Sequence, residues 1–151
     1  MVCFFLLSLT IGIEGGYVAP AVEFTNINSG VVFSFFTQRH TRRGDVALSF
    51  QTTFHTGDNE RYAMNSYGVR LGWSKNVWRF SPVLEIGGDY LNRSIGDASE
   101  SGYAVTYGIG LLWNLRREKL RFYPKVYYEG LTDLKVHGGF IGFKLGFAYE
   151  M

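Results

Sequence analysis

The sequence of 151 residues has little of what marks several common protein classes. Its single cysteine, Cys3, excludes a disulfide framework and a zinc site built from cysteines. Charged residues make up 19% of the chain, below the ~25% that is usual in soluble domains. The basic residues are scattered and the net charge is only +2, so no nucleic-acid partner is expected. Aromatic residues at 17% exclude an intrinsically disordered chain.

Long hydrophobic runs are also missing, apart from one near the N-terminus. Residues 2–13 form an apolar stretch that is shorter than the ~20 residues a spanning helix needs. It fits the hydrophobic region of a signal peptide, but no Lys or Arg precedes it and no small-residue cleavage site follows it. Apolar and polar residues alternate from Leu7 onward. Residues 1–14 are therefore open to both interpretations. We favour a strand over residues 7–18, with residues 1–6 as the remnant of a signal peptide.

The rest of the chain alternates apolar and polar residues at a spacing of two, which is typical of strands, and no segment has the period of a helix. The pattern predicts eight strands, at residues 7–18, 31–39, 44–55, 63–74, 77–90, 103–115, 120–129 and 140–151. The connections 40–44, 75–76 and 116–119 are short, whereas 19–30, 56–62, 91–102 and 130–139 are longer and polar. Short turns at one end and longer loops at the other are typical of an up-and-down β-barrel in an outer membrane. We therefore expect residues 1–151 to form a single all-β domain, an eight-stranded antiparallel transmembrane β-barrel with both termini and the short turns on the periplasmic side.

The polar face of these strands decides between a soluble and a membrane barrel. A soluble barrel such as a lipocalin turns its apolar face inwards, whereas a membrane barrel turns it outwards. The polar face carries ten charged residues, which are Glu14, Arg70, Arg79, Glu85, Asp89, Arg121, Lys125, Glu129, Lys144 and Glu150. Glycines stand between them, at Gly12, Gly68, Gly72, Gly87, Gly108, Gly110, Gly142 and Gly146. Glycine weakens a solvated strand but leaves room in a crowded lumen. We therefore predict a lumen filled by a network of paired charges, with no open pore.

Aromatic residues mark both edges of the apolar face. The tryptophans Trp73, Trp78 and Trp113 lie beside the tight turns, and the tyrosines Tyr67, Tyr90, Tyr103 and Tyr128 lie towards the other ends of the strands. The ten residues from Tyr103 to Trp113 span roughly 25 Å along a tilted strand, which is the height of the apolar band of a membrane barrel. These seven residues are the predicted membrane-interface aromatics.

The C-terminal sequence carries a family resemblance. Lys144, Gly146, Tyr149 and Met151 occupy the four positions of the β-signal of bacterial outer-membrane proteins, although Met replaces the usual terminal aromatic. Residues 11–20 (IGIEGGYVAP) also look like the first strand of small outer-membrane barrels. The whole chain is similar to OmpX-like proteins and to the OmpA transmembrane domain. The resemblance implies a bacterial outer-membrane location, surrounding membrane lipid, and recognition by the barrel-assembly machinery during biogenesis.

Two hairpin registers follow from the pattern. The turn at 75–76 sets Ser74 opposite Val77, which places Trp73 beside Trp78 and Leu71 beside Phe80. In the last hairpin we predict Arg121 opposite Glu150, Tyr127 opposite Lys144 and Lys125 opposite Gly146. The other register that keeps inward residues together sets Lys125 against Lys144, a like-charge pair that costs free energy.

The sequence gives only weak support for a catalytic, metal-binding or lipid-binding role. The residues His55, Ser66 and Asp89 are candidates for a lipid-modifying enzyme, but their spacing specifies no triad. The acidic tips 58–60 and 97–100 lack the spacing of an EF-hand, and no catalytic residue, cofactor or metal is predicted. The cluster Arg39, Arg42, Arg43, Arg116, Arg117 and Lys119 fits either anionic headgroups or solvated turns. We expect an outer-membrane barrel of structural or surface-interaction type. The alternatives are a lipid-modifying barrel enzyme, a soluble ligand-binding barrel, in which Trp73 and Trp113 would be buried, and a narrow pore for small solutes.

Overall fold

The computed structural model describes residues 9–22, 27–57, 62–95, 97–117, 119–132 and 137–151. Their strands are β1 (Leu9–Val22), β2 (Ile27–Thr41), β3 (Gly44–Gly57), β4 (Tyr62–Ser74), β5 (Phe80–Ile95), β6 (Ala98–Trp113), β7 (Leu115–Arg117), β8 (Leu120–Thr132) and β9 (His137–Glu150). The expected strand over 7–18 is observed from Leu9 onward as β1, whereas its first two residues and the interpretation of residues 1–6 lie outside the described residues. Among the described residues, no helix has both the length and the apolar character needed to cross a membrane.

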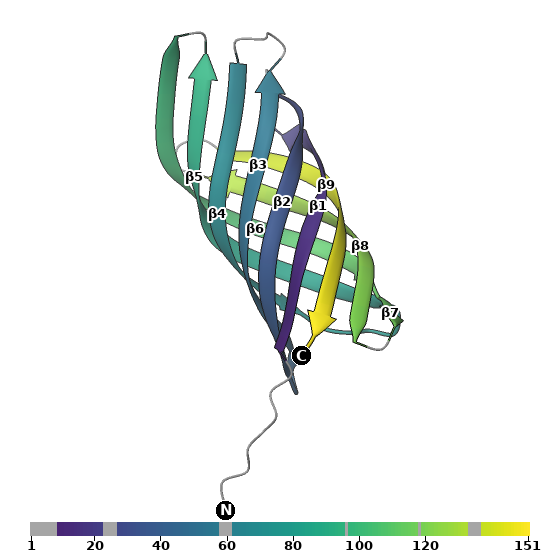
Figure 1. Cartoon of the computed structure of the whole chain (residues 1–151). Helices are drawn as coiled ribbons and strands as arrows, with labels where there is room; N and C mark the ends of the chain where they lie inside the picture. Colours follow the sequence, from purple (N-terminus) through teal and green to yellow (C-terminus); the bar gives the residue numbers. More distant parts are fainter. Residues whose placement is uncertain (1–8, 23–26, 58–61, 96, 118, 133–136) are drawn as a thin grey trace, which may run out of the picture.

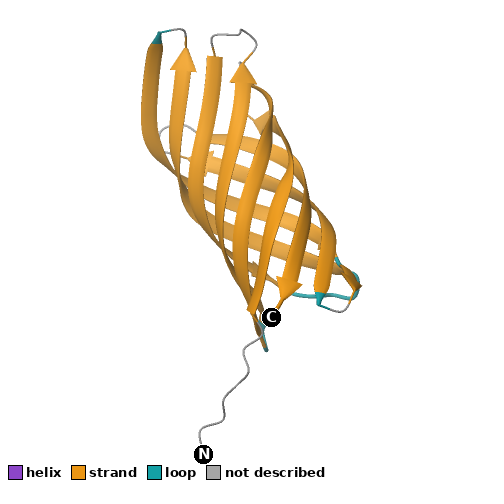
Figure 2. Ribbon diagram, in the orientation of Figure 1, coloured by secondary structure: helices purple, strands orange, loops and turns teal. Residues whose placement is uncertain are grey.

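The strands form one closed antiparallel barrel (Figures 1 and 2). From β1 to β6 each strand pairs with the next in the chain, β8 pairs with β9, and the pairs of β1 with β9 and of β6 with β8 complete the barrel. The three-residue β7 follows β6 after Asn114 and pairs with β8, so it continues the β6 wall rather than adding a ninth wall. The predicted fold class, an eight-stranded up-and-down barrel, is confirmed. The backbone NH of Met151 bonds the carbonyl of Leu9 at 2.9 Å, which brings the two ends of the described chain together.

The two faces of the sheet have inverted polarity relative to a soluble protein. Large apolar side chains on the outer face are about half exposed, for example Phe50 at 49% and Ile86 at 59%. Inward side chains such as Arg70 and Lys144 are 2% and 1% exposed. Because side chains alternate across a strand, a period of two in the sequence sends one set outwards and the other into the lumen. The outer face is thus apolar and the lumen holds the charges.

The connections at the end opposite the termini are shorter than the sequence suggested. Longer loops were expected over 19–30, 56–62, 91–102 and 130–139, but strands occupy most of these residues, and the connecting segments are 23–26, 58–61, 96–97 and 133–136. Neighbouring strands extend together, as in the pairs of Asn92 with Ser101 and Arg93 with Glu100. Where a strand extends beyond the apolar band, its backbone hydrogen bonds to the next strand continue, but its side chains are polar. The polarity of these residues therefore indicated contact with water, not the absence of a strand. We call this the loop end, and the end with the termini the short-turn end.

The predicted register of the turn after β4 is wrong. Leu71 faces Ile86 and Trp73 faces Leu84, because the turn extends over residues 75–79. Its tip is a tight reversal between Val77 and Phe80, which exchange two backbone hydrogen bonds of 2.7 and 3.1 Å. The side chain of Trp78 therefore lies at the tip of this turn and does not pair with Trp73.

The predicted register of the last hairpin is also wrong. In the structure Lys125 faces Lys144, Tyr127 faces Gly142 and Arg121 faces Ala148. The like-charge neighbours are tolerated because each lysine bonds a carboxylate on another strand, as described below.

Candidate functional site: a charged lumen inside an apolar wall

The centre of the lumen holds an arginine between two carboxylates. Arg70 of β4 donates hydrogen bonds from Nη2 to Asp89 Oδ2 of β5 at 3.0 Å and to Glu129 Oε1 of β8 at 2.8 Å. The three side chains are 2%, 0% and 7% exposed. Glycines make the space: a Cβ on Gly68 would lie 1.7 Å from Asp89 Oδ1, and one on Gly87 would lie 2.8 Å from the Cγ of Arg70. An arginine bridging β4, β5 and β8 links opposite walls of the barrel.

Two lysines extend the network towards the short-turn end. Lys125 Nζ donates to Glu85 Oε1 at 2.7 Å, and Lys144 Nζ donates to Glu14 Oε2 at 3.2 Å. Lys144 Nζ also donates to Gln51 Oε1 at 2.5 Å, and Gln51 Nε2 donates to Glu129 Oε2 at 3.1 Å. Gln51 therefore joins the pair of Lys144 and Glu14 to the arginine cluster.

Two tyrosines of β8 occupy the space left by glycines of β9, and this packing explains the observed register. A Cβ on Gly146 would lie 2.2 Å from the Cζ of Tyr123, and one on Gly142 would lie 2.4 Å from ring atoms of Tyr127. Tyr123 donates to Glu14 Oε1 at 2.9 Å. The ring centroid of Tyr127 lies 4.7 Å from Lys144 Nζ, within the range of a cation–π contact. The predicted register would place Tyr127 opposite Lys144 and lose its fit over Gly142.

A layer of buried apolar side chains lies in the lumen on the loop-end side of the charges, and the sequence analysis did not predict it. The layer is a cluster of nine buried residues: Val18, Ile27, Val32, Met64, Leu91, Ala104, Tyr127, Leu131 and Phe140. Most of them stand at inward positions of the alternating pattern, so the sequence of each strand already indicated that they point into the lumen. The prediction of a purely ionic filling was incomplete, because the inward rows carry charges near the middle of the barrel and apolar residues towards the loop end.

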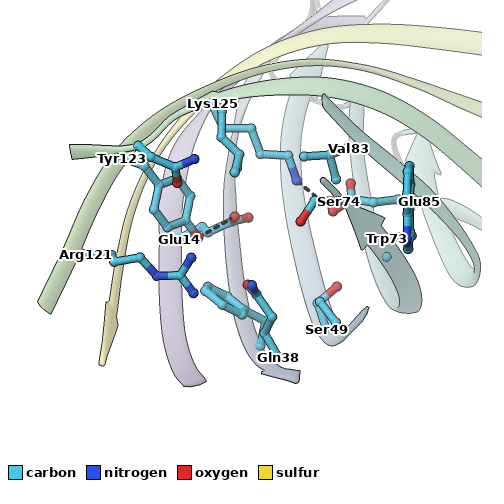
Figure 3. Close-up of a pocket in the computed structure, with 15 residues that line it drawn as sticks. Glu14, Gln38, Ser49, Trp73, Ser74, Val83, Glu85, Arg121, Tyr123 and Lys125 are labelled. Carbon is cyan, nitrogen blue, oxygen red and sulfur yellow. Dashed lines mark hydrogen bonds and ion pairs between the residues drawn. The ribbon is translucent and has the colours of Figure 1, made fainter. Parts of the chain in front are cut away.

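Small cavities lie on the short-turn side of the charges. One, of about 50 Å³, is lined by Glu14, Gln38, Arg121 and Lys125 among others (Figure 3). A second, of about 100 Å³, continues at the mouth and is lined by Thr10, Gln38, His40, Asp45, Asn76, Arg121 and Glu150. The first has room for one or two water molecules and the second for a few.

Three residues predicted for the charge network lie outside its central cluster. Arg79 is exposed in the turn 75–79, where its guanidinium lies 5.1 Å from the ring of Trp78, so its inward placement was wrong. That error follows from the wrong register of the same turn. Arg121 and Glu150 line the cavity at the mouth and are half-buried. The other seven predicted charges are the central ones described above.

The predicted interface aromatics lie on the outer face of the barrel. Trp73 and Trp113 are 37% and 43% exposed near the short-turn end, which contradicts the soluble barrel that would bury them. Towards the loop end, Tyr67 faces Tyr90 across the strands, and the rings of Tyr90 and Tyr103 are 5.4 Å apart. Tyr128 is half-buried on β8, and Trp78 is 81% exposed. Of the β-signal residues, Lys144 and Gly146 face the lumen, whereas Tyr149 is exposed on the outer face and Met151 at the end of the chain.

The candidate enzyme residues face the lumen, not the outer wall where a lipid substrate would lie. His55 is 2% exposed, stacks on Phe140 at 4.8 Å and bonds the carbonyl of Asn28 through Nδ1 at 3.1 Å. Ser66 exchanges a hydrogen bond with Thr53, and Asp89 bonds Arg70. Within the described ranges, no group of three or more His, Cys, Asp or Glu residues is arranged to hold a metal ion. The acidic tip 58–60 lies outside those ranges, and Asp97 and Glu100 are exposed at the tip of the β5–β6 hairpin.

A closed barrel with an apolar outer face and a charged interior defines the class of small outer-membrane-type β-barrels. No protein-family model matches the chain, and no curated protein matches it. Several solved structures do match the chain. The N-terminal β-barrel domain of Pseudomonas aeruginosa OprF matches with a TM-score of 0.65 at 14% identity, covering 93% of this chain and 97% of that one. The Yersinia pestis outer-membrane protein Ail in a phospholipid nanodisc matches with a TM-score of 0.60 at 19% identity, covering 96% and 99%. Neisserial surface protein A matches with a TM-score of 0.53 at 9% identity, covering 96% and 97%. The chain therefore shares the fold of these proteins.

Proposed function

We propose that this protein is an integral β-barrel of the bacterial outer membrane, of structural or surface-interaction type, whose lumen is plugged by its own side chains. The observation that carries the proposal is the inverted polarity of the sheet. Every wall of the barrel presents large apolar side chains outwards, including Ile13, Phe33, Val69, Val105 and Phe143, each at least 44% exposed. Such a surface is unfavourable in water and suits a hydrocarbon layer.

The contents of the lumen support a plug. An ion entering from the short-turn end would pass the two small cavities and then meet Arg70, Lys125 and Lys144, each already bonded to a carboxylate. Beyond them lies the buried apolar cluster around Met64 and Phe140, whose side chains an ion would have to displace. Eight strands give an interior that side chains can just fill. The barrel then acts as an anchor, and its exposed loop end is the surface free to contact partners.

The orientation and assembly of the barrel follow from the same proposal. We place the short-turn end, with both described termini, on the periplasmic side. The last strand, which carries Lys144, Gly146, Tyr149 and Met151, would be the segment bound by the barrel-assembly machinery, and membrane lipid would surround the outer face.

Two measurements test the proposal. Protein refolded into phospholipid vesicles should migrate as a compact band on a gel without heating and shift on heating. The same protein in planar bilayers should give conductance no higher than protein-free bilayers. Failure to insert into vesicles would contradict the membrane barrel, whereas insertion with steady conductance would contradict only the plug.

A further inference from the structure

The charges of the chain divide unevenly between the two ends of the barrel. Among the side chains that the structure describes, the short-turn segments carry the seven cations Arg39, Arg42, Arg43, Lys75, Arg79, Lys119 and Arg121 against the two acids Asp45 and Glu150. The loop-end segments carry Arg93 against the two acids Asp97 and Glu100. The formal net charge of these side chains is thus +5 at the short-turn end and −1 at the loop end. The seven central lumen charges contribute −1.

The cations and acids of the short-turn end also point in different directions. Asp45 is buried, accepts a hydrogen bond from Gln38 at 2.5 Å and contacts His40, and with Glu150 it lines the cavity at the mouth of the lumen. The exposed charged side chains that the structure describes at this end are all cationic: Arg39, Arg42, Arg43, Lys75, Arg79 and Lys119. Asp45 and Glu150 therefore face the mouth of the lumen, where Arg121 joins them, and the exposed charges described at this end are cationic.

Tryptophans stand among these cations on the outer surface. Arg39 of β2 faces Leu9 and Val46 across the strands, and Val46 in turn faces Trp73, so the arginine belongs to an outward row that includes a tryptophan. Trp78 and Arg79 form the tip of the turn between Val77 and Phe80. An exposed indole and a cation at one level suit the boundary between hydrocarbon and headgroups.

The backbone at this turn tip is strained. Trp78 has φ of 60°, a left-handed conformation that glycine or asparagine adopts more readily. Its side chain is 81% exposed, so packing within the chain does not explain a tryptophan there. Strained positions of this kind cluster at sites that contact ligands. The strain is explained if the indole contacts something outside the protein.

We propose that the short-turn end is a docking surface for anionic phospholipid headgroups, centred on Trp78 and Arg79 and on the turn that carries Arg39, Arg42 and Arg43. The inference rests on the proposed membrane barrel and adds a lipid class to it. Phosphate groups accept hydrogen bonds from arginine, and a lipid with net negative charge gains from the excess of cations. The indole inserts beside the acyl chains and holds the turn at headgroup depth.

The test compares the lipid preference of the folded barrel and its variants. The barrel is folded into phosphatidylcholine vesicles, and its association with spin-labelled phosphatidylglycerol is measured against spin-labelled phosphatidylcholine by electron paramagnetic resonance. The native chain should favour phosphatidylglycerol at low ionic strength, and the preference should weaken in high salt. The triple variant Arg39→Gln, Arg42→Gln, Arg43→Gln should reduce the preference by about fivefold or more, since each cation near a charged surface contributes about that factor. Arg79→Gln should reduce it by a smaller amount.

Two controls separate this proposal from other outcomes. Arg93→Gln removes a cation at the loop end and should leave the preference unchanged. Trp78→Gly relieves the left-handed strain, so it should fold at least as stably as the native chain while losing headgroup preference. Equal association of both lipids with the native chain, or an equal effect of Arg93→Gln, would overturn the proposal. The heat-shifted gel band reports the folded membrane barrel independently, so a negative lipid result leaves the proposed function standing.

Discussion

Removing the central arginine tests the lumen most directly. The substitution Arg70→Met keeps the bulk of the side chain but leaves Asp89 and Glu129 without their shared cation, which now bonds them at 3.0 and 2.8 Å. All three side chains are at most 7% exposed, so water does not replace the lost partner. Breaking a buried ion pair by removing one member costs about 3–5 kcal/mol, and we expect a loss of that size in the free energy of unfolding.

The assay is urea unfolding of the barrel in vesicles, followed by tryptophan fluorescence. The double variant Arg70→Met with Asp89→Asn removes one of the two unpaired buried carboxylates. It should recover part of the lost free energy of unfolding. The control Arg42→Gln changes an exposed turn residue and should stay within about 0.5 kcal/mol of the native chain. A loss below about 1 kcal/mol for Arg70→Met would mean that water reaches both carboxylates, which would refute the plugged lumen.

Two further predictions concern the packing of the lumen and the polarity of the wall. Gly146→Val should destabilise the barrel by about 1–3 kcal/mol in the same assay, because its Cβ would lie 2.2 Å from the ring of Tyr123. In a Tyr123→Ala background the added cost should largely disappear, and an undiminished cost would show that the clash lies elsewhere. Ile86→Arg, at a position 59% exposed on the outer wall, should cost about 2–4 kcal/mol in vesicles. Asn92→Arg, near the loop end, should cost about 0–1 kcal/mol, and equal costs at both positions would argue against a hydrocarbon layer around Ile86.

The inward and outward rows of the barrel were predictable because side-chain alternation is a local property. Leu71 and Arg70 are neighbours in the chain, yet the first is 54% exposed and the second 2%. The contrast between glycine-rich charged rows and uninterrupted apolar rows was enough to orient the sheet. These features depend only on each strand's own sequence.

Register and connector length were harder to predict because they depend on partners in other strands. A two-strand comparison made Lys125 beside Lys144 look unfavourable. In the closed barrel, each lysine instead meets a carboxylate of a strand outside this hairpin, Glu85 of β5 for Lys125 and Glu14 of β1 for Lys144. The ring of Tyr127 also requires Gly142 opposite it. The two carboxylates lie outside the hairpin, so the sequence of the hairpin alone does not contain that constraint.

The register of the last hairpin can be measured by cross-linking two outward positions. In a Cys3→Ser background, Val126→Cys with Phe143→Cys places the thiols directly opposite each other. Val126→Cys with Leu145→Cys is the matched pair that would be opposite in the register with Lys125 facing Gly146. Directly opposite residues have Cβ atoms ~5 Å apart and diagonal neighbours ~7 Å, whereas a disulfide needs ~4 Å. Mild oxidation of the folded barrel should therefore cross-link the first pair much faster, as read by non-reducing gel mobility. Faster cross-linking of the second pair would show that β8 is shifted by two residues against β9. In that register the bonds from Lys125 to Glu85 and from Tyr123 to Glu14 could not form as described.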